Sequence, residues 1–339
     1  MAEVITKEID NKKDWEDFLS KHDEANFLQS WYWGQFHENL GQKIVRSGFY
    51  RNNKLEGAML SIIEEAKRAK HLIVPAGPII DWKDKDIVSA FVKELKKIAY
   101  LNDCAFVRVR PQLISDDFSK KLFKDLGFSD APMHLHAQLT NQLDITKPEE
   151  EILANMRKNT RHEIRKAEKE KIKITASKDP KDIRKFYNLQ VETSVRQKFV
   201  PFPYEYLSEQ FRIFAENNLA FLYNAYLGKK LLSQAFIIFY GTEAVYHYGT
   251  GTLEGRNHPG AYLIQWEAIR EAKKRELRRY NLWGVANDPK HRFYGLSIFK
   301  RGFGGEDVDY LEAQDLVINY PRYLINLTIE KLRKLRRRV

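Results

Sequence analysis

The stretch AFLYNAYLGKKLLSQAFIIFYG, residues 220–241, consists of two apolar runs separated by Gly228 and Lys229. A two-residue bend between such runs predicts an antiparallel pair of strands. A helical pattern of apolar residues follows at 260–277, and a further short apolar run follows at 279–285. This order predicts an α/β (α+β) fold with a mixed, mostly antiparallel sheet and helices against it.

The first half of the chain has the same order of patterns. KIVRSGFYRNNKLEGAMLSIIEE, residues 43–65, predicts two strands with a bend at Asn52 and Asn53. A helical pattern at 86–103 and a strand pattern at 104–111 come next. Lys230 lies 176 positions after Lys54, and Tyr280 lies 175 positions after Ala105. A duplicated α/β domain explains this nearly constant offset better than chance.

The duplication sets the expected domain boundaries. We expect a first domain at 1–147 and a second domain at 148–317. The helical pattern at about 318–339 lies outside both copies, and we expect that it is able to pack back on the first domain.

The composition is that of a folded globular protein with an excess of positive charge. Of the 339 residues, 43% are hydrophobic, and 57 Lys and Arg face 46 Asp and Glu, giving a net charge of +11. The excess favours an anionic partner, such as nucleic acid, a nucleotide-linked substrate or an acidic membrane face, although it also fits a merely solubilising surface. Cys104 is the only cysteine, which excludes an intrachain disulfide. The charged start of the chain and the lack of an apolar run of about 20 residues predict a cytoplasmic protein.

Common catalytic signatures are missing from the sequence. It contains no G-x-S-x-G elbow, no Walker lysine loop, no H-E-x-x-H and no G-x-G-x-x-G. His134 and His136 alternate along an expected strand, which favours a structural role over metal binding, and we expect no metal site. In YHYGTG, residues 246–251, strand alternation places Tyr246 and Tyr248 on one face and His247 on the other.

Two basic segments stand out. Residues 156–173 carry eight Lys and Arg against three Glu and predict a helix with one basic face, which is either solvated or in contact with phosphate. In FYGLSIFKRGFGGEDVDYL, residues 293–311, Lys300 and Arg301 lie among aromatics and glycines that are typical of a buried strand and a tight turn.

Six motifs occur in a recognisable order. They are FLQSWYWGQF (27–36), PAGP (75–78), MRKNTRHEIRKAEK (156–169), ETSVRQKF (192–199), GTGT (249–252) with PGAYLIQWEAIREAKK (259–274), and GLSIFKRGFGG (295–305). In this order and spacing the chain resembles the Fem-type (FemABX) peptidoglycan aminoacyltransferases over nearly its whole length. It has no room for the long helical arm of some members, so it resembles the compact ones.

The resemblance implies a fold and an activity. The fold would be two tandem GNAT-like domains. The activity would be transfer of an amino acid from aminoacyl-tRNA to the stem-peptide amine of a peptidoglycan precursor, either UDP-linked or lipid-linked, without a cofactor.

The resemblance also implies site residues in the second domain. Lys300 matches the lysine near the reacting ends, where a fixed cation can stabilise the negative charge that grows on the carbonyl oxygen and then on the ribose oxygen. Arg196 matches an arginine that contacts the phosphates of the precursor, and Tyr248 resembles a tyrosine that lines the substrate.

In the first domain the chain departs from the family at two places. The helix with Trp33 has His37 where a relative that binds a nucleotide-linked precursor has lysine, and a histidine is only partly charged near neutral pH. Arg110 stands where relatives commonly have an aspartate before the proline, so no general base is evident. Arg108 or Arg110 is then expected either to face an anionic substrate or to lie on a solvated side of its strand.

An RNA partner would give the excess charge a purpose. Candidate RNA or anion contacts are Arg161, Arg165, Lys274, Arg278 and Arg301. The tail EKLRKLRRR, residues 330–338, places Leu332 and Leu335 among cations. It therefore fits either RNA or peripheral contact with the anionic inner face of the membrane.

Two other functions compete with this interpretation. An acyl-CoA-dependent GNAT enzyme needs a Q/R-x-x-G-x-G/A loop, and the nearest match, RNHPGA at 256–261, has Pro259 at the first glycine position. The second competitor is a non-catalytic module that binds RNA or a membrane.

Overall fold

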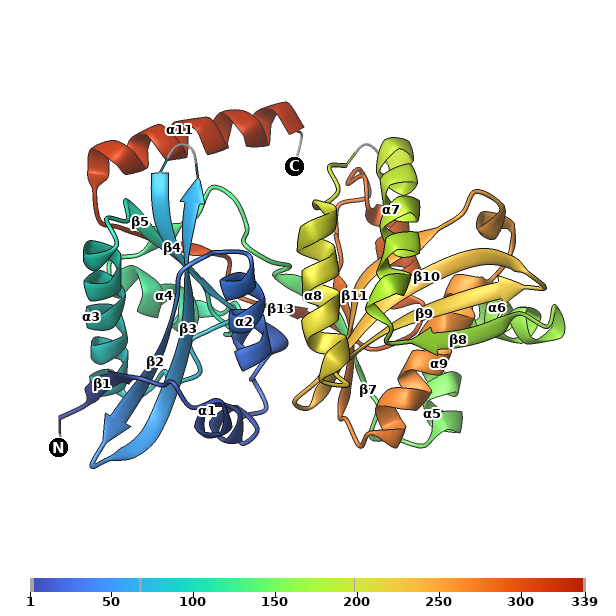
Figure 1. Cartoon of the computed structure of the whole chain (residues 1–339), viewed down its shortest axis with the longest axis horizontal. Coiled ribbons are helices and arrows are strands. Elements are labelled where there is room, and N and C mark those ends of the chain that lie inside the picture. The colour runs from blue at the N-terminus through green and yellow to red at the C-terminus, as the bar shows by residue number, and fades with distance from the viewer. Residues whose placement is uncertain (1–2, 67–68, 198, 338–339) are drawn as a thin grey trace. The chain divides into compact units, whose positions relative to one another are not determined.

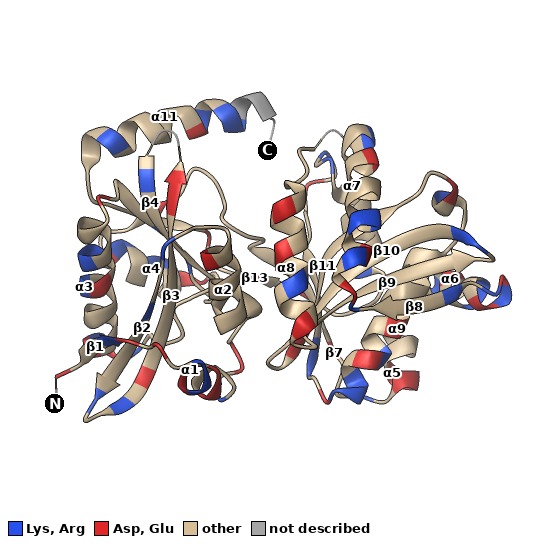
Figure 2. Ribbon diagram, viewed as in Figure 1, with Lys and Arg blue, Asp and Glu red and all other residues tan. Residues whose placement is uncertain are grey.

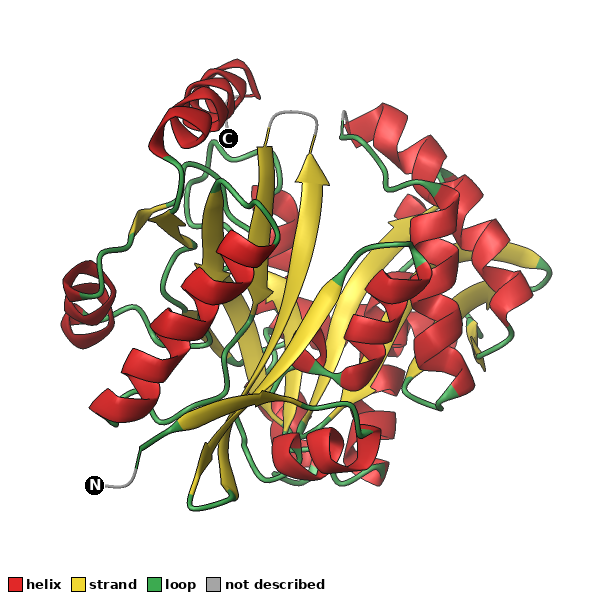
Figure 3. Cartoon of the chain, turned by 60° about the vertical axis from the view of Figure 1, so that its left-hand side comes forward, coloured by secondary structure: helices red, strands yellow, loops and turns green. Residues whose placement is uncertain are grey.

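The computed structural model describes residues 3–66, 69–197 and 199–337, with side chains of the last helix as far as Lys334. The chain divides into two compact units, Met1–Gln138 with Asp309–Val339 and Leu139–Val308 (Figure 1). Each unit contains one seven-stranded sheet with helices packed against it (Figure 3). No helix among the described residues has the length and apolar character needed to cross a membrane.

The first unit holds the sheet β1-β2-β3-β4-β5-β14-β6. Its elements are β1 (Ile5–Glu8), α1 (Lys12–Leu19), η1 (Phe27–Gln29), α2 (Trp31–Asn39), β2 (Ile44–Arg51), β3 (Lys54–Ala66), β4 (Ala69–Pro75), α3 (Lys85–Leu101), β5 (Phe106–Arg110), α4 (Asp117–Asp125), β6 (Ser129–Asp130), β14 (Gln314–Val317) and α11 (Tyr320–Arg337). Strands β4 and β5 are parallel and the other neighbours are antiparallel.

The second unit holds the sheet β13-β7-β12-β11-β10-β9-β8. Its elements are β7 (Leu139–Asp144), α5 (Glu149–Asn155), α6 (Lys158–Lys169), β8 (Lys173–Ser177), η2 (Pro180–Asp182), α7 (Ile183–Gln197), α8 (Tyr204–Glu216), β9 (Ala220–Leu227), β10 (Lys230–Tyr240), β11 (Glu243–Gly251), η3 (Glu254–Asn257), α9 (Gly260–Lys274), β12 (Arg279–Gly284), α10 (Tyr294–Arg301) and β13 (Glu306–Asp309). Strands β11 and β12 are parallel.

The expected duplication is present in the topology. The run β2-β3-β4-α3-β5 has its counterpart in β9-β10-β11-α9-β12, and both runs place one parallel pair beside antiparallel ones. The bends lie where the sequence predicts them, with positive φ angles at Asn52 (50°), Asn53 (61°) and Gly228 (58°). Asn and Gly adopt this backbone region more readily than other residues, which is why such bends can be recognised in a sequence.

Two strands belong to a different sheet from the one that the sequence indicated. Strand β7 follows β6 in the chain but pairs with β12 in the second sheet, while β14 follows β13 but pairs with β5 in the first sheet. The units therefore divide at 138/139 and 308/309 rather than at 147 and 317. The final helix α11 lies in the first unit, where Tyr323 packs against Phe106 with ring centroids 5.3 Å apart.

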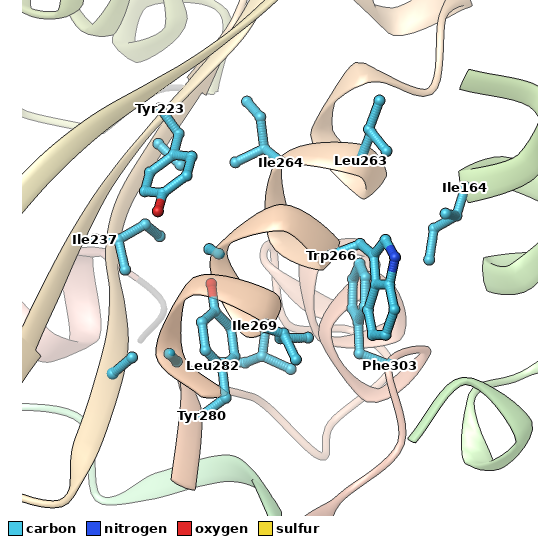
Figure 4. Packing of buried hydrophobic residues seen from close by; sticks show 14 of the residues in the cluster. Ile164, Tyr223, Ile237, Leu263, Ile264, Trp266, Ile269, Tyr280, Leu282 and Phe303 are labelled. Carbon is cyan, nitrogen blue, oxygen red and sulfur yellow. The ribbon is translucent and has the colours of Figure 1, made fainter. Parts of the chain in front are cut away.

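Each unit has its own hydrophobic core. In the first, Phe91 and Leu95 of α3 pack with Val107 and Val109 of β5. In the second, residues of α9 pack with residues of β9, β10 and β12 and with Phe303. Figure 4 labels ten of its members: Ile164, Tyr223, Ile237, Leu263, Ile264, Trp266, Ile269, Tyr280, Leu282 and Phe303.

The segment 293–311 is not the buried strand that its composition indicated. Residues Tyr294–Arg301 form α10, whose buried side chains are Ser297 and Lys300. The helix buries Ser297 and Lys300 while Leu296 and Ile298 are each 43% exposed, so its apolar residues do not mark the buried face. The expected tight turn follows, with positive φ angles at Gly304 (88°) and Gly305 (79°).

A buried ionic cluster joins α11 and β14 to the first sheet. Arg108 of β5 donates from Nε to Asp315 Oδ1 over 2.7 Å and from Nη2 to Glu330 Oε2 over 2.9 Å. The side chain of Asp315 is fully buried, and Tyr323 donates to its other oxygen over 3.1 Å. Removing one member of such a cluster leaves buried charge without compensation.

Replacing Arg108 by Ala should therefore lower the free energy of unfolding by about 3–5 kcal/mol, because Asp315 and Glu330 would lose their cation. Arg322→Ala is the matched control, since Arg322 pairs with the exposed Asp103, and it should cost less than about 1 kcal/mol. Chemical denaturation of both variants measures the difference. Equal losses would show that the cluster does not hold the unit together.

Candidate functional site

The second sheet opens between its two parallel strands. Strands β11 and β12 are paired only from Glu243–Val245 to Arg279–Asn281. Beyond this point β12 also loses register with β7, between Asn281 and Gly284. Trp283 lies in this irregularity with a φ angle of 64°, which is unusual for a bulky residue. We call the opening between β11 and β12, beyond Val245 and Asn281, the fork.

The corresponding place in the first sheet is closed. Strands β4 and β5 stay paired up to Pro75 and Arg110, the last residue of each strand. The buried amide of Gln29 donates to Pro75 O over 2.6 Å and accepts from Leu60 N over 2.8 Å. Ligands of open α/β sheets bind beyond the carboxyl ends of parallel strands. The fork of the second unit is therefore the better candidate for a site.

Lys300 lies at the fork with its amine held away from solvent. Its side chain comes from the last turn of α10 and is 6% exposed. Nζ donates to Gly284 O over 2.7 Å and lies 5.7 Å from the ring centre of Tyr246. No carboxylate among the described residues lies within ion-pairing distance of it. Burial lowers the pKa of Lys300 from 10.5 to about 7, so that both protonation states are populated near neutral pH.

The segment after β12 is fastened to α10, which fixes the position of Lys300. Ser297 Oγ accepts from Ala286 N over 2.8 Å. Arg301 donates from Nη1 to Ala286 O over 3.1 Å and forms an ion pair with Asp307 at 2.6 Å. Arg301 was predicted to contact RNA. Its guanidinium is engaged in contacts within the unit, so it has a structural role there.

The alternation predicted for Tyr246, His247 and Tyr248 is wrong. A bulge opposite Phe236 and Ile237 leaves His247 as the extra residue, so that Tyr248 pairs with Phe236 and Tyr246 pairs with Ile237. Tyr246 consequently faces the α9 core, while His247 and Tyr248 lie on the other face with ring centroids 3.9 Å apart. A bulge of this kind re-aims side chains in a strand.

An aromatic wall lines that other face of β11. His247 and Tyr248 lie 5.5 Å and 6.0 Å from Phe236, and Phe202 lies 5.9 Å from Tyr248. Burial lowers the pKa of His247 to about 3, so its imidazole is neutral. Burial also raises the pKa of Tyr248 well above its usual value, so its hydroxyl stays protonated. His247 and Tyr248 are therefore neutral, and the whole aromatic wall carries no charge at neutral pH.

Arg196 reaches the far end of β11. From the last turn of α7 its Nη2 donates to Gly251 O over 2.7 Å and to Thr193 Oγ1 over 2.9 Å. Its Nε is buried and has no acceptor among the described residues. A guanidinium whose Nη2 is engaged while Nε is unpaired keeps donors for an anionic group, as the predicted phosphate contact requires.

Trp33 and His37 lie together in α2 of the first unit, with ring centroids 5.1 Å apart. Burial lowers the pKa of His37 to about 4, so it carries no charge at neutral pH and cannot replace the lysine of nucleotide-binding relatives as a cation. His37 Nδ1 is bonded to Gln42 Oε1, and Trp33 Nε1 has no acceptor among the described residues. Neutral hydrogen bonds are what this pair can offer a ligand.

Arg108 and Arg110 are both buried, 5% and 2% exposed, so the alternative of a solvated strand face is wrong. Arg108 is also withdrawn as an anion-binding residue, because the two carboxylates that it bonds would repel an anion. Arg110 donates to Ala137 O over 2.6 Å and lies 4.7 Å from the ring centre of Tyr310. These contacts give Arg110 a structural environment within the first unit.

The predicted RNA or anion surfaces are only partly available. Arg161 donates to Ala154 O over 2.8 Å, whereas Arg165, Lys274 and Arg278 are exposed. Figure 2 shows the basic residues along α6 in blue. The segment with His134 and His136 is irregular rather than a strand, and the described residues contain no cluster of three metal-binding side chains.

Comparisons with known proteins agree with this architecture. Residues 11–127 match the FemAB family, and residues 154–294 match an acetyltransferase (GNAT) domain. The aminoacyltransferase FemA of Staphylococcus epidermidis is 22% identical, over 84% of this chain and 88% of that protein. The lipid II:glycine glycyltransferase of Staphylococcus aureus (strain USA300) is 19% identical, over 90% and 91%.

The chain is similar to Fem-type acyltransferases in its first part and to GNAT acyltransferases in its second. The crystal structure of FemX matches it with a TM-score of 0.85 and 18% identity, covering 95% of this chain and 99% of that one. A tandem GNAT protein from the clavulanic acid biosynthesis pathway matches with a TM-score of 0.61 and 10% identity, over 93% and 98%. The predicted GNAT-like fold is thereby confirmed.

Some features of the candidate site could not be predicted from the sequence. The unusual backbone of Trp283, the contact of Lys300 with Tyr246 and the re-aimed Tyr248 all depend on irregularities in β11 and β12. The one available signal was the adjacent Trp283 and Gly284 near the end of an expected strand, since glycine within a strand pattern indicates a bulge.

The buried amine should make stability depend on pH. The pKa of Lys300 in the folded chain is about 7, below its value of 10.5 in an exposed lysine, so the unfolded chain holds the extra proton between these values. The contribution of Lys300 to the free energy of unfolding therefore rises with pH across this window, by a few kcal/mol in total.

Replacing Lys300 by Met removes this contribution. Relative to the wild type, the variant should be most favoured near pH 7 and should lose that advantage as the pH approaches 10, in denaturation series at several pH values. Lys229→Met, at an exposed bend, is the control and should show a flat difference. A flat difference for Lys300→Met as well would mean that the amine is hydrated.

Proposed function

We propose that this protein moves an amino acid from aminoacyl-tRNA to the stem-peptide amine of a peptidoglycan precursor. The proposal is supported by its similarity to FemA and to a lipid II:glycine glycyltransferase. The single observation that carries it is the amine of Lys300, which is buried at the fork, bonded to one carbonyl, and without a counter-ion among the residues that the structure describes. A buried titratable group with a strongly shifted pKa is typical of functional sites.

The reaction exchanges an ester for an amide. The acceptor amine attacks the carbonyl carbon, a C–N bond forms, and negative charge develops on the carbonyl oxygen. The C–O bond to the ribose then breaks, and the ribose oxygen needs a proton while the new amide nitrogen must lose one. In its ammonium form Lys300 stabilises the negative oxygen at a poorly hydrated place, where such a charge contributes more than in water.

Lys300 also suits the proton transfer. The ammonium form gives a proton to the departing ribose oxygen, and the resulting amine takes the proton that the new amide nitrogen releases. The residue ends in its starting state, and no separate base is required. A pKa near 7 allows both steps, whereas a lysine of ordinary pKa would be a poor acid at neutral pH.

The other residues at β11 would hold the substrates. Arg196 presents its spare Nε–H to a phosphate, and the neutral aromatic wall with Tyr248 lines the path toward the fork. Holding the two reactants in line supplies a large part of the rate enhancement of such bimolecular transfers. The exposed cations Arg165, Lys274 and Arg278 are the remaining candidates for contact with the tRNA backbone.

The competing acyl-CoA function fits less well. Helix α9 begins at Gly260 with Pro259 as its preceding residue, so the amide that would bind the pyrophosphate is missing. The binding-module alternative leaves the cost of burying Lys300 without a purpose. Contact with a lipid-linked precursor would place the protein peripherally at the inner membrane face.

Substitution of Lys300 tests the proposal in a reconstituted reaction with charged tRNA and a nucleotide-linked or lipid-linked precursor. Lys300→Ala should lower kcat by about 10²–10³-fold with little change in KM, since the interaction forms in the transition state. Lys300→Arg keeps the charge but cannot release a proton, so it should recover little activity. Lys229→Ala should behave as the wild type.

Three outcomes would argue against this function. Equal changes in kcat and KM would make Lys300 a docking contact. Product from acetyl-CoA and none from charged tRNA would favour the acyl-CoA enzyme. RNA binding at low salt without any product would favour the non-catalytic module.

Arg196 should act on binding rather than on the chemical step. Arg196→Ala should raise KM for the precursor by about tenfold or more, because a charge-assisted hydrogen bond contributes about 1.5–3 kcal/mol. Lys at this position should recover only part of the loss. A drop in kcat at constant KM would contradict a phosphate-binding role.

A further inference from the structure

Helix α11 packs on the first unit through a face that is only partly apolar. The side chains that face the first unit are Tyr323, Asn326 and Glu330, which are 5%, 3% and 8% exposed. Two of them are polar anchors, since Glu330 is bonded to Arg108 and Tyr323 donates to Asp315. Polar contacts, together with the packing of Tyr323 and Leu327 against Phe106 and its neighbours, hold the helix in place, and several other apolar residues lie on the opposite side.

The outward side of α11 is an apolar stripe. Leu324, Ile325 and Leu332 are 39%, 56% and 60% exposed. At about 100° per residue, their spacing places them with Thr328 on one face, opposite Asn326 and Glu330. Leu335, the other leucine of the tail, has a side chain outside the described residues.

Three basic residues lie beside this stripe in the last described turn of α11. Lys331, Arg333 and Lys334 are exposed. Figure 2 shows Lys and Arg in blue along α11. By helical position, Lys331 lies at one edge of the stripe, and Arg333 and Lys334 lie further round the helix, one on each side of the stripe. A helix with an apolar face edged by Lys and Arg lies in the interface of an anionic bilayer, where its apolar side chains enter the lipid and its cations meet the headgroups.

We propose that the outward face of α11 binds the surface of a bilayer that contains anionic phospholipid. RNA would use the cations but would leave Leu324, Ile325 and Leu332 in water, so RNA does not account for the stripe. The ionic cluster around Arg108 fastens the helix to the first unit, so that contact of the stripe with lipid brings the whole enzyme to the membrane. This inference concerns binding and does not depend on the proposed transfer reaction.

Sedimentation with vesicles tests the inference. The full chain is mixed with phosphatidylcholine vesicles that contain or lack phosphatidylglycerol, at low and moderate salt. The wild type should bind the anionic vesicles and bind neutral ones much more weakly. Exchanging Leu324, Ile325 and Leu332 together for Ser should weaken binding to anionic vesicles at least about tenfold, since apolar burial is lost.

A charge variant probes the other half of the surface. Exchanging Lys331, Arg333 and Lys334 for Glu should weaken binding to anionic vesicles on the order of a hundredfold, since each cation contributes about fivefold near such a surface. Leu253→Ser is the matched control, because Leu253 is 67% exposed in the second unit, and it should bind as the wild type. The exchanged side chains are exposed, so thermal unfolding should change little.

The possible outcomes are distinct. Wild-type protein that fails to sediment with anionic vesicles, or variants that bind as well as the wild type, would overturn the inference. Unchanged vesicle binding with a loss of tRNA binding would assign the surface to RNA instead. Lys300→Ala should still bind vesicles fully, so an inactive enzyme and a chain that does not bind membranes give separate results.

Discussion

The account of this protein depends on one constraint, the confinement of the Lys300 amine at the fork, where it donates to the carbonyl of Gly284. Removing an ammonium group from water is costly, and in proteins the cost appears as a lowered pKa when no counter-ion compensates. The core around α9 and Phe303, the bonds of Ser297 and the ion pair of Arg301 stabilise this placement.

The duplicated fold explains how such a place arises in one unit and not in the other. Both sheets contain a parallel pair with its carboxyl ends at an equivalent point. In the first unit pairing continues to the end of both strands and Gln29 bonds to Pro75. In the second unit pairing stops at Val245 and Asn281, and both strands are irregular on their other sides, β11 at His247 and β12 at Trp283. Local irregularities of a few residues have given the two copies different capacities.

Much of the architecture could be predicted because it rests on local patterns. The strand pairs with bends at Asn52, Asn53 and Gly228 and the following amphipathic helices have the periods of their structures. The pairing of β7 with β12 and of β14 with β5 could not be predicted, because strand partners depend on contacts far apart in the chain. Helix α10 could not be predicted from apolar periodicity, because it buries Ser297 and Lys300 and exposes Leu296 and Ile298.

The residues of the candidate site show the same contrast between local patterns and distant contacts. Lys300, Arg196 and Tyr248 were proposed from motifs, and all three lie in the second unit around β11, β12 and the segment that follows them. Arg108 was proposed from its place on a strand, and its carboxylate partners from β14 and α11 were invisible in the sequence. The protonation states of His37 and Lys300 likewise depend on burial, which only the folded chain reveals.

The most direct measurement is a crystal structure with a stable mimic of the transfer intermediate. A phosphonate that joins an aminoacyl analogue to adenosine and to a stem-peptide amine would imitate the tetrahedral state. The account predicts that Lys300 Nζ leaves or shares Gly284 O and bonds to a phosphonate oxygen at about 2.7–2.9 Å. A mimic bound away from the fork, with Nζ unmoved, would contradict it.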